Sequence, residues 1–153
     1  MKLTGKIALV TGATRGIGLE TVRQLAETRV HVLLAGRNRD KAVEAALQLQ
    51  RQGLLVEAIA LDVTDSASIA AAAQEIERKH GKLDILVNNA GIIRRCDAID
   101  FSEKDWDDVI DLNLKTVFFL SQAVAKQFIK QGTGGKIINV ASMLSFQGGV
   151  RVP

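Results

Sequence analysis

Three glycines in the stretch TGATRGIG could bind a phosphate group. Gly12 would allow a tight turn, Gly16 would let the backbone approach a pyrophosphate, and Gly18 would permit a helix to pack closely on a strand. The helix that follows would present free N–H groups and its positive dipole end to the phosphates. A glycine-rich turn can also serve backbone geometry alone. The apolar run before it and the helical spacing after it favour phosphate binding.

Two polar residues in the second half of the chain are further candidates for chemistry. Ser142 ends the apolar run KIINVAS, and the exit of a buried strand is a common place for a ligand-contacting side chain. Asn113 lies between two leucines in DLNLKTVFF. Each has a structural alternative, because Ser142 could simply end a strand and Asn113 could cap or kink a helix.

Five short β-rich runs alternate with helical patterns along the chain. The runs cover residues 6–12, 30–36, 55–63, 83–91 and 136–142, and continuous apolar runs are typical of strands buried on both faces. Helices are expected from Gly18, from a cap at Asp40 through Gln52, from a cap at Asp65 to Gly81, and over 103–131 after the capping pair Ser102 and Asp105. Helical crossovers between five strands predict an α/β fold with a parallel sheet covered on both faces.

The composition is that of a globular protein. Of 153 residues, 47% are hydrophobic and 24% charged, with a net charge of +3. The basic residues are dispersed, which argues against a nucleic-acid partner. No apolar run reaches the about 20 residues of a membrane span, and the first residues lack the layout of a signal peptide. The single cysteine, Cys96, predicts a reducing, cytoplasmic setting, and the absence of linkers and repeats predicts one domain over residues 1–153.

Three motifs together carry a family resemblance. TGATRGIG at 11–18, LDV at 61–63 and NNAG at 88–91 are similar, in order and spacing, to the cofactor signatures of the short-chain dehydrogenase/reductase family. The resemblance covers the whole chain and implies a Rossmann-type doubly wound parallel sheet, here of about five strands in the order 3-2-1-4-5. It also implies an oxidoreductase that transfers a hydride between a nicotinamide cofactor and a carbonyl or alcohol substrate.

The resemblance assigns roles to individual residues. The implied cofactor-binding residues are Gly12, Thr14, Arg15, Gly16, Ile17 and Gly18 at the pyrophosphate and ribose, Asp62 and Val63 at the adenine, and Asn89, Ala90 and Gly91 toward the nicotinamide. It implies that Asn113 helps to hold a water in a proton relay and that Ser142 orients the substrate carbonyl. From the residues alone, Asp62 could instead be a turn or helix-capping carboxylate, and Asn89 could serve turn geometry.

The end of the second predicted strand bears on the choice of cofactor. An acidic residue there would bind the ribose hydroxyls of NAD and repel a 2′-phosphate, whereas this chain has LLAGRN, with Arg37 and no acid. In the geometry of the family, Arg15 points toward the same region. Because guanidinium groups pair well with phosphate, we expect NADP(H) in preference to NAD(H). The alternative for each arginine is a solvated surface charge.

The implied reaction needs a proton donor. The family uses a tyrosine followed four residues later by a lysine, about a dozen residues after the serine. This sequence contains no tyrosine, and its last lysine, Lys136, precedes Ser142. His31 and His80 lie on other elements and are interpreted as surface residues, and no metal site is expected. We therefore expect a chain that is truncated before the catalytic helix and substrate loop and is inactive by itself.

The second half of the chain has a narrower resemblance. From Ile92 onward it is similar to the 2-deoxy-D-gluconate 3-dehydrogenase branch of the family, whereas the first half resembles generic NADP-type members. This difference suggests a chimera joined near the NNAG turn, and ordinary divergence is the alternative. Arg94, Arg95 and Arg151 could face a carboxylate substrate or be surface charges.

Two other functions remain open from the sequence. The chain could be a self-associating scaffold or interaction module without cofactor turnover, or one half of a split enzyme. A homo-oligomer would form through the amphipathic helix expected over 103–131 or through the exposed edge of the fifth strand, because uncovered strands and apolar surfaces promote association.

Overall fold

The computed structural model describes residues 3–152. The strands are β1 (Ile7–Val10), β2 (His31–Gly36), β3 (Val56–Ala60), β4 (Ile85–Asn88) and β5 (Lys136–Asn139). The α-helices are α1 (Gly16–Glu27), α2 (Arg39–Gln50), α3 (Ser66–His80), α4 (Glu103–Ile110), α5 (Thr116–Gln131) and α6 (Leu144–Gln147). A 3-10 helix, η1 (Ala98–Asp100), precedes α4, and a π-helical turn, η2 (Asp111–Lys115), joins α4 to α5.

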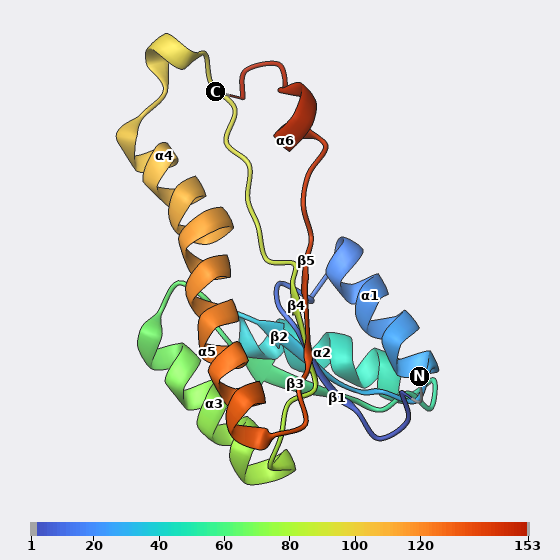
Figure 1. Cartoon of the computed structure of the whole chain (residues 1–153). Coiled ribbons are helices and arrows are strands. Elements are labelled where there is room, and N and C mark those ends of the chain that lie inside the picture. Colours follow the sequence, from blue (N-terminus) through green and yellow to red (C-terminus); the bar gives the residue numbers. More distant parts are fainter. Residues whose placement is uncertain (1–2, 153) are drawn as a thin grey trace.

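The five strands form one parallel sheet in the order β3-β2-β1-β4-β5. This confirms the predicted α/β, Rossmann-type fold and its strand order. Figure 1 shows α1 and α2 on one face of the sheet and α3 and α5 on the other. All carboxyl ends of the strands lie at the same edge, so the segments after β1, β2, β3, β4 and β5 meet there.

Alternate residues of the strands build two cores. Ala8, Val10, Val32 and Leu34 pack with the buried residues of α1 and α2, whereas Ile7, Leu9, Leu33 and Ala35 pack with those of α3 and α5. The predicted continuous apolar runs follow from this double burial. Strand β5 is the exception, since Ile138 and Val140 at this edge remain about half exposed.

The helix boundaries differ from the prediction at one cap. Asn38, not Asp40, caps α2, because its side-chain oxygen accepts a hydrogen bond from the Lys41 N–H. Asp40 lies in the first turn instead. The predicted cap at Asp65 and the left-handed stop at Gly81, which bound α3, are both confirmed.

The helix predicted over 103–131 is helical throughout but not uniformly α-helical. Ser102 caps it as expected, by accepting a hydrogen bond from the Asp105 N–H. The π-helical turn η2 interrupts the regular repeat between α4 and α5, with Asn113 at its centre. Insertions of this kind are rare and frequently mark functional sites.

Two long segments extend past the carboxyl edge of the sheet. Residues 89–101 and 140–152 run beside each other toward α4 and α6 (Figure 1), and the Cys96 N–H donates to the Arg151 carbonyl. Strands β4 and β5 are therefore shorter than predicted.

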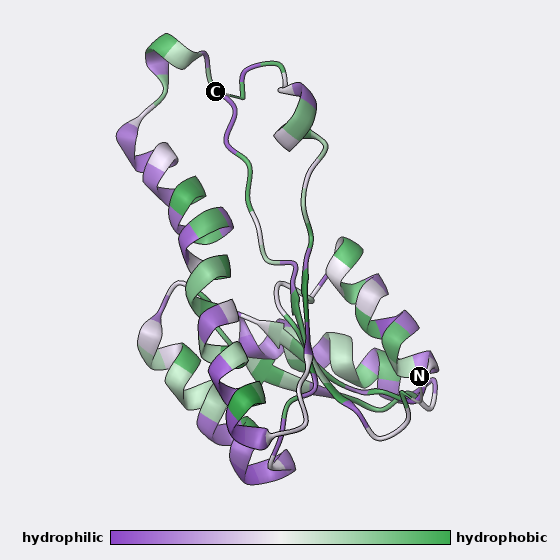
Figure 2. Cartoon of the chain, in the orientation of Figure 1, coloured by the Kyte–Doolittle hydropathy of each residue, from purple (hydrophilic) through white to green (hydrophobic). Residues whose placement is uncertain are grey.

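The hydropathy of the residues follows the layers of the fold. Figure 2 shows mostly hydrophobic residues (green) on the strands, whereas hydrophobic and hydrophilic residues alternate on α3 and α5. Among residues 3–152, no helix is long and apolar enough to cross a membrane.

Candidate functional site

The glycine turn lies between β1 and α1 at the carboxyl edge of the sheet. Gly12 has a φ of +62°, and a Cβ there would lie 2.8 Å from the Ala90 Cα. Gly18 packs on both turns, since its Cβ would lie 2.7 Å from the Gly12 carbonyl oxygen and 2.5 Å from the Asn89 Nδ2. Gly16 has a φ of +59° with no atom within 4 Å of an added Cβ. Two of the glycines therefore serve close packing, and the third leaves open space above the helix N terminus.

A hydrogen-bond network joins the glycine turn to the NNAG turn. The buried Thr11 hydroxyl accepts from the Asn89 and Ala90 N–H groups, each at 3.0 Å. The Asn89 side chain donates in return to the carbonyls of Thr11 and Gly12. Thr11 was not among the residues predicted from the sequence, although it directly follows a buried apolar strand. Thr11 and Asn89 are thus the residues that fix the two turns against each other.

The N terminus of α1 is suited to a phosphate. Within residues 3–152, α2, α3 and α4 each have a side-chain cap, whereas no side chain caps α1 and its first turn contains no acid. Its first N–H groups therefore point toward open space beside Gly16. A nucleotide pyrophosphate fits this arrangement, because the helix dipole and the free donors both favour an anion.

Arg15 and Arg37 lie on adjoining segments. The Ala13 N–H donates to the Ala35 carbonyl at 2.9 Å, and the Thr14 methyl group fills the space above Gly36. Both arginines are exposed. In the described part of the chain, neither guanidinium has a carboxylate within ion-pairing distance. The fold thus places side by side the two segments that carry these arginines.

Asp62 and Val63 follow β3 at the same edge. One Asp62 oxygen accepts from both the N–H and the hydroxyl of Thr64, and the Asp62 N–H donates to the Ser68 hydroxyl. Asp62 therefore stabilises the turn, in agreement with the alternative prediction of a turn carboxylate. Its other carboxylate oxygen has no hydrogen bond among residues 3–152. Val63 is buried, and its carbonyl accepts from the Thr116 hydroxyl.

Asn113 connects η2 to the segment after the NNAG turn. Its Oδ1 accepts from the Ile92 N–H at 3.0 Å, and its Nδ2 donates to the Ile92 carbonyl at 2.7 Å. An added Cβ on Gly91 would lie 3.3 Å from the same Oδ1. Asn113 thus neither caps nor merely kinks the helix but holds the adjoining loop to it.

Asn113 and Ser142 line one cavity of about 350 Å³ beyond the sheet. Its walls also include Ile92, Trp106 and Ile110, and Ser142 joins this lining two residues before α6 begins. The Ser142 hydroxyl accepts a hydrogen bond from the Leu144 N–H and is otherwise exposed. The fold therefore brings the two predicted catalytic residues to the same hollow, although 29 positions separate them in the sequence.

A hydrogen-bonded group of three polar side chains, of which only Asn88 is buried, supports the same edge of the sheet. The Asn88 Nδ2 donates to the Asn139 Oδ1 at 2.8 Å and to the Ser121 hydroxyl at 2.9 Å. Asn88 and Asn139 are paired in the register of β4 and β5. The local sequence around Asn88 indicates only a turn, and it gives no sign of Asn139 or Ser121, because only the pairing of strands brings the three together.

The three arginines considered for a carboxylate substrate all have partners. Arg94 pairs with Asp105 and Asp108, Arg95 donates to the Val150 carbonyl, and Arg151 pairs with Asp97. The hydrogen bond from Lys104 lowers the pKa of Asp108, with Arg94 adding to the effect. These contacts favour the interpretation as surface charges that tie the extended segments together.

His31 and His80 are not the isolated surface residues that the sequence suggested. Their rings lie 4.9 Å apart, and the His80 side chain is only 10% exposed. Burial lowers the pKa of His80. Both lie at the amino edge of the sheet, opposite the glycine turn, and cannot serve chemistry at the Ser142 cavity.

Comparisons with known proteins show the family of the chain. A family model described as short chain dehydrogenase matches residues 6–153. The chain is 52% identical over 151 residues to 2-dehydro-3-deoxy-D-gluconate 5-dehydrogenase from Dickeya dadantii and 50% identical over 151 residues to the protein of that name from Escherichia coli. Each alignment covers 99% of this chain and 59% of the relative.

A solved structure has the same architecture. The gluconate 5-dehydrogenase from Burkholderia cenocepacia, crystallised with NADP and tartrate, is 40% identical, with a TM-score of 0.91 over 99% of this chain and 59% of that one. The chain thus spans about three-fifths of the length of the relatives it matches. The alignments include both halves of the chain. By its sequence, strand order and turn geometry, the chain belongs to the short-chain dehydrogenase family.

Proposed function

We propose that residues 1–153 form a single NADP(H)-binding domain of a short-chain oxidoreductase, one that transfers a hydride between nicotinamide and a carbonyl or alcohol group of a sugar acid. The observation that carries the proposal is the uncapped N terminus of α1 beside the open space at Gly16. The bound cofactor would supply or accept the hydride.

The chain's own residues would bind and orient the cofactor. The α1 N–H groups and the Gly12–Gly18 turn would hold the pyrophosphate, and Arg15 and Arg37 would pair with a 2′-phosphate. Asp62 and Val63 would contact the adenine. Asn89, Ala90 and Gly91 would line the path toward the nicotinamide, because the Thr11 network holds this turn beside Gly12.

The sugar acid would enter the cavity that Asn113 and Ser142 share. The names of the two relatives and of the solved neighbour support a substrate of this class. Ser142 would orient the reacting carbonyl through its hydroxyl, and Asn113 would position a water. The setting that we propose is the cytoplasm.

A polypeptide of these 153 residues would bind the nucleotide without turnover. Its sequence has no tyrosine, and neither histidine lies at the edge of the sheet where the cavity opens. The loss of a general acid lowers rates by about 10²–10⁴-fold.

The test is a fluorescence titration with NADPH and NADH, followed by an assay with NADP⁺ and gluconate or 2-dehydro-3-deoxygluconate. We expect saturable binding that is tighter for NADPH, and no turnover. A lack of binding to both nucleotides would contradict the assignment of the site. Turnover by this chain alone would contradict the proposed inactivity, and restored activity on adding a separate polypeptide with the tyrosine and lysine would support a split enzyme.

A specific observation favours self-association as a second property. Phe118 and Phe119 on α5 are more than half exposed, and α5 and β5 flank an open groove of about 520 Å³ at the sheet edge. We propose that this surface, on α5 and β5, pairs two copies of the chain. Light scattering of the Phe118→Ser, Phe119→Ser double variant would show a loss of the dimer, whereas a monomeric parent protein would exclude it.

A further inference from the structure

A cluster at the amino edge of the sheet has no part in the proposed function. Both histidines of the sequence belong to it. His31 is the first residue of β2, His80 is the last residue of α3, and Glu57 lies between them on β3. The glycine turn is at the opposite edge, so this cluster is separate from the nucleotide site (Figure 1).

The donor atoms of the cluster are close enough to share one ion. The His31 Nε2 lies 2.9 Å from the Glu57 Oε1, and the His80 Nε2 lies 3.8 Å from the Glu57 Oε2. One ligand atom from each of the three residues lies within 4.8 Å of the others. In a tetrahedral zinc site, bonds of 2.0–2.2 Å put neighbouring ligand atoms about 3.3–3.6 Å apart. Small rotations of these side chains therefore suffice to reach that geometry.

The backbone holds the three side chains in place. In the register of the sheet, Leu33 is paired with Glu57, so His31 and Glu57 project from neighbouring strands onto the face that α3 covers. The side chains are partly buried, with exposed fractions of 25% for His31, 35% for Glu57 and 10% for His80. A site built on strands and a helix is more rigid than one on loops.

The charges around the cluster also favour a cation. Glu57 and Glu75 face one cation, Lys79, and the C terminus of α3 adds its negative dipole end. The Lys79 Nζ lies 2.7 Å from Glu75 and 3.5 Å from Glu57. An ion at Glu57 would therefore displace the Lys79–Glu57 contact and leave the shorter Lys79–Glu75 contact intact.

We infer that His31, Glu57 and His80 form a binding site for a divalent transition-metal ion of the zinc type, with two imidazole nitrogens, one carboxylate and a fourth position open to water. This donor set suits zinc and cobalt better than calcium or magnesium, which prefer oxygen ligands. Because the ligands come from β2, β3 and α3, a bound ion would link these three elements and stabilise the fold.

The experiment uses the purified protein without a histidine tag and with Cys96→Ser, which removes its only thiol. Co²⁺ is titrated and the visible absorption of a tetrahedral complex recorded, with Zn²⁺ as the competitor. We expect one equivalent to bind and the melting temperature to rise. Glu57→Gln, His31→Asn and His80→Asn should each weaken binding by at least about tenfold, as loss of even an outer-shell partner does.

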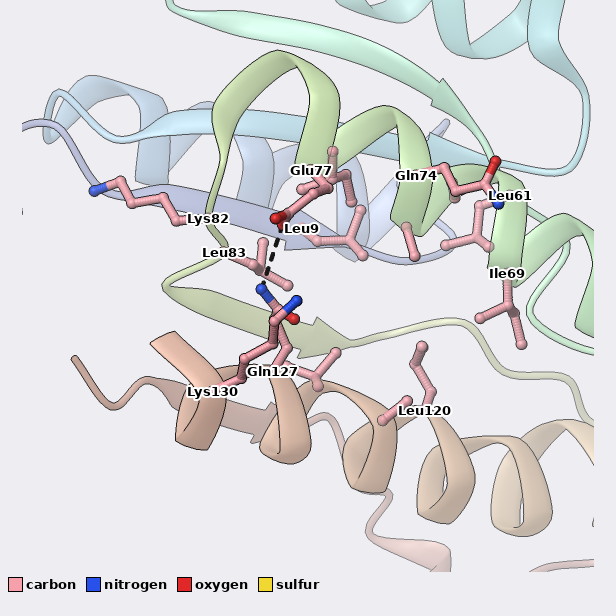
Figure 3. Close-up of a pocket in the computed structure, with 15 residues that line it drawn as sticks. Leu9, Leu61, Ile69, Gln74, Glu77, Lys82, Leu83, Leu120, Gln127 and Lys130 are labelled. Atoms are coloured by element: carbon pink, nitrogen blue, oxygen red, sulfur yellow. Dashed lines mark hydrogen bonds between the residues drawn. The ribbon is translucent and has the colours of Figure 1, made fainter. Parts of the chain in front are cut away.

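Two variants guard against indirect effects. Glu77→Gln makes the same charge change as Glu57→Gln and lies on α3, the helix that carries His80. Glu77 is directed toward α5, however, where the Gln127 Nε2 donates to it at 3.4 Å (Figure 3). This control should leave the affinity unchanged, whereas Lys79→Gln should strengthen binding by removing the competing cation. The inference is overturned if no saturable binding occurs, or if the Glu57, His31 and His80 variants bind Co²⁺ as tightly as the Glu77 control.

Discussion

Asn113 holds Ile92 at both polar atoms of its backbone, with hydrogen bonds of 3.0 Å and 2.7 Å. Asn113 lies in the π-helical turn, and Ile92 begins the segment that leads away from the NNAG turn. The amide therefore sets the distance between the helix and the path proposed for the nicotinamide.

Replacement of Asn113 tests this link. Asn113→Ala removes both hydrogen bonds, and we expect the free energy of unfolding to fall by about 1–2 kcal/mol. Urea denaturation measures the loss, and hydrogen exchange should become faster at the Ile92 amide. Leu114→Ala is the matched control, because the exposed Leu114 side chain lies beside Asn113 in the sequence. Unchanged exchange at Ile92 in the Asn113 variant would contradict the assigned contact.

Thr11 is expected to contribute to both stability and nucleotide binding. Thr11→Val keeps the shape of the side chain but removes the acceptor for two N–H groups. We expect a loss of about 2 kcal/mol in the free energy of unfolding, since unsatisfied donors are costly, together with weaker NADPH binding. Thr11→Ser retains the hydroxyl and should recover most of both properties. A larger loss with serine than with valine would assign the role to the methyl group instead.

Two glycines of the turn should respond differently to alanine. Gly12→Ala places a Cβ 2.8 Å from the Ala90 backbone, so we expect failure to fold or a large loss of stability. Gly16→Ala meets no neighbouring atom, and only its positive φ costs about 1–2 kcal/mol. We expect the Gly16 variant to fold, as judged by circular dichroism, but to lose NADPH affinity. Full affinity in this variant would place the phosphate elsewhere.

Arg15 and Arg37 should determine the choice between the two nucleotides. For Arg15→Gln, Arg37→Gln we expect NADPH affinity to fall by at least about tenfold, because two charged hydrogen bonds to phosphate are lost. NADH affinity should change little, and the preference for NADPH should decrease as salt is added. Arg51→Gln, at the far end of α2, is the control. Equal losses for NADPH and NADH would mean that the arginines contact the pyrophosphate.

Asp84 should make stability depend on pH. It is 4% exposed and lies 2.7 Å from the Lys6 Nζ and 3.1 Å from the Lys82 Nζ. Burial opposes the charged form, but the hydrogen bonds from Lys6, the Ile7 backbone and Lys82 outweigh it and lower the pKa of Asp84.

The pKa of Asp84 is lower in the folded state than in the unfolded state, where it is near 4. The charged carboxylate therefore contributes fully to the free energy of unfolding above about pH 4, and this contribution is lost as the pH falls through the folded pKa. We expect Asp84→Asn to lower the free energy of unfolding at pH 7 by about 1–3 kcal/mol. The difference between parent and variant should shrink on acidification, as measured by urea denaturation from pH 7 to pH 3. A difference that is constant over this range would contradict the assignment.

The sequence by itself determined the fold and the turn at which we propose that the nucleotide binds. Continuous apolar runs specify strands buried on two faces, and the glycine spacing specifies the turn between β1 and α1. Local chemistry also predicted the caps at Asp65 and Ser102, because a cap depends on residues within three or four positions. It misassigned the cap of α2, where Asn38 and Asp40 are both able to accept the bond.

Only the tertiary structure decided which distant side chains meet. The Thr11 hydroxyl contacts the NNAG turn because β1 lies beside β4, and Asn88 contacts Asn139 because β4 is paired with β5. The π-helical turn at Asn113 likewise could not be predicted, because the spacing of apolar residues over 103–131 indicates only a helix. His31 and His80 looked like separate surface residues, since 48 residues lie between them, yet the pairing of β2 with β3 and the packing of α3 bring both to Glu57. Contacts of this kind depend on strand order and register, which no local segment encodes.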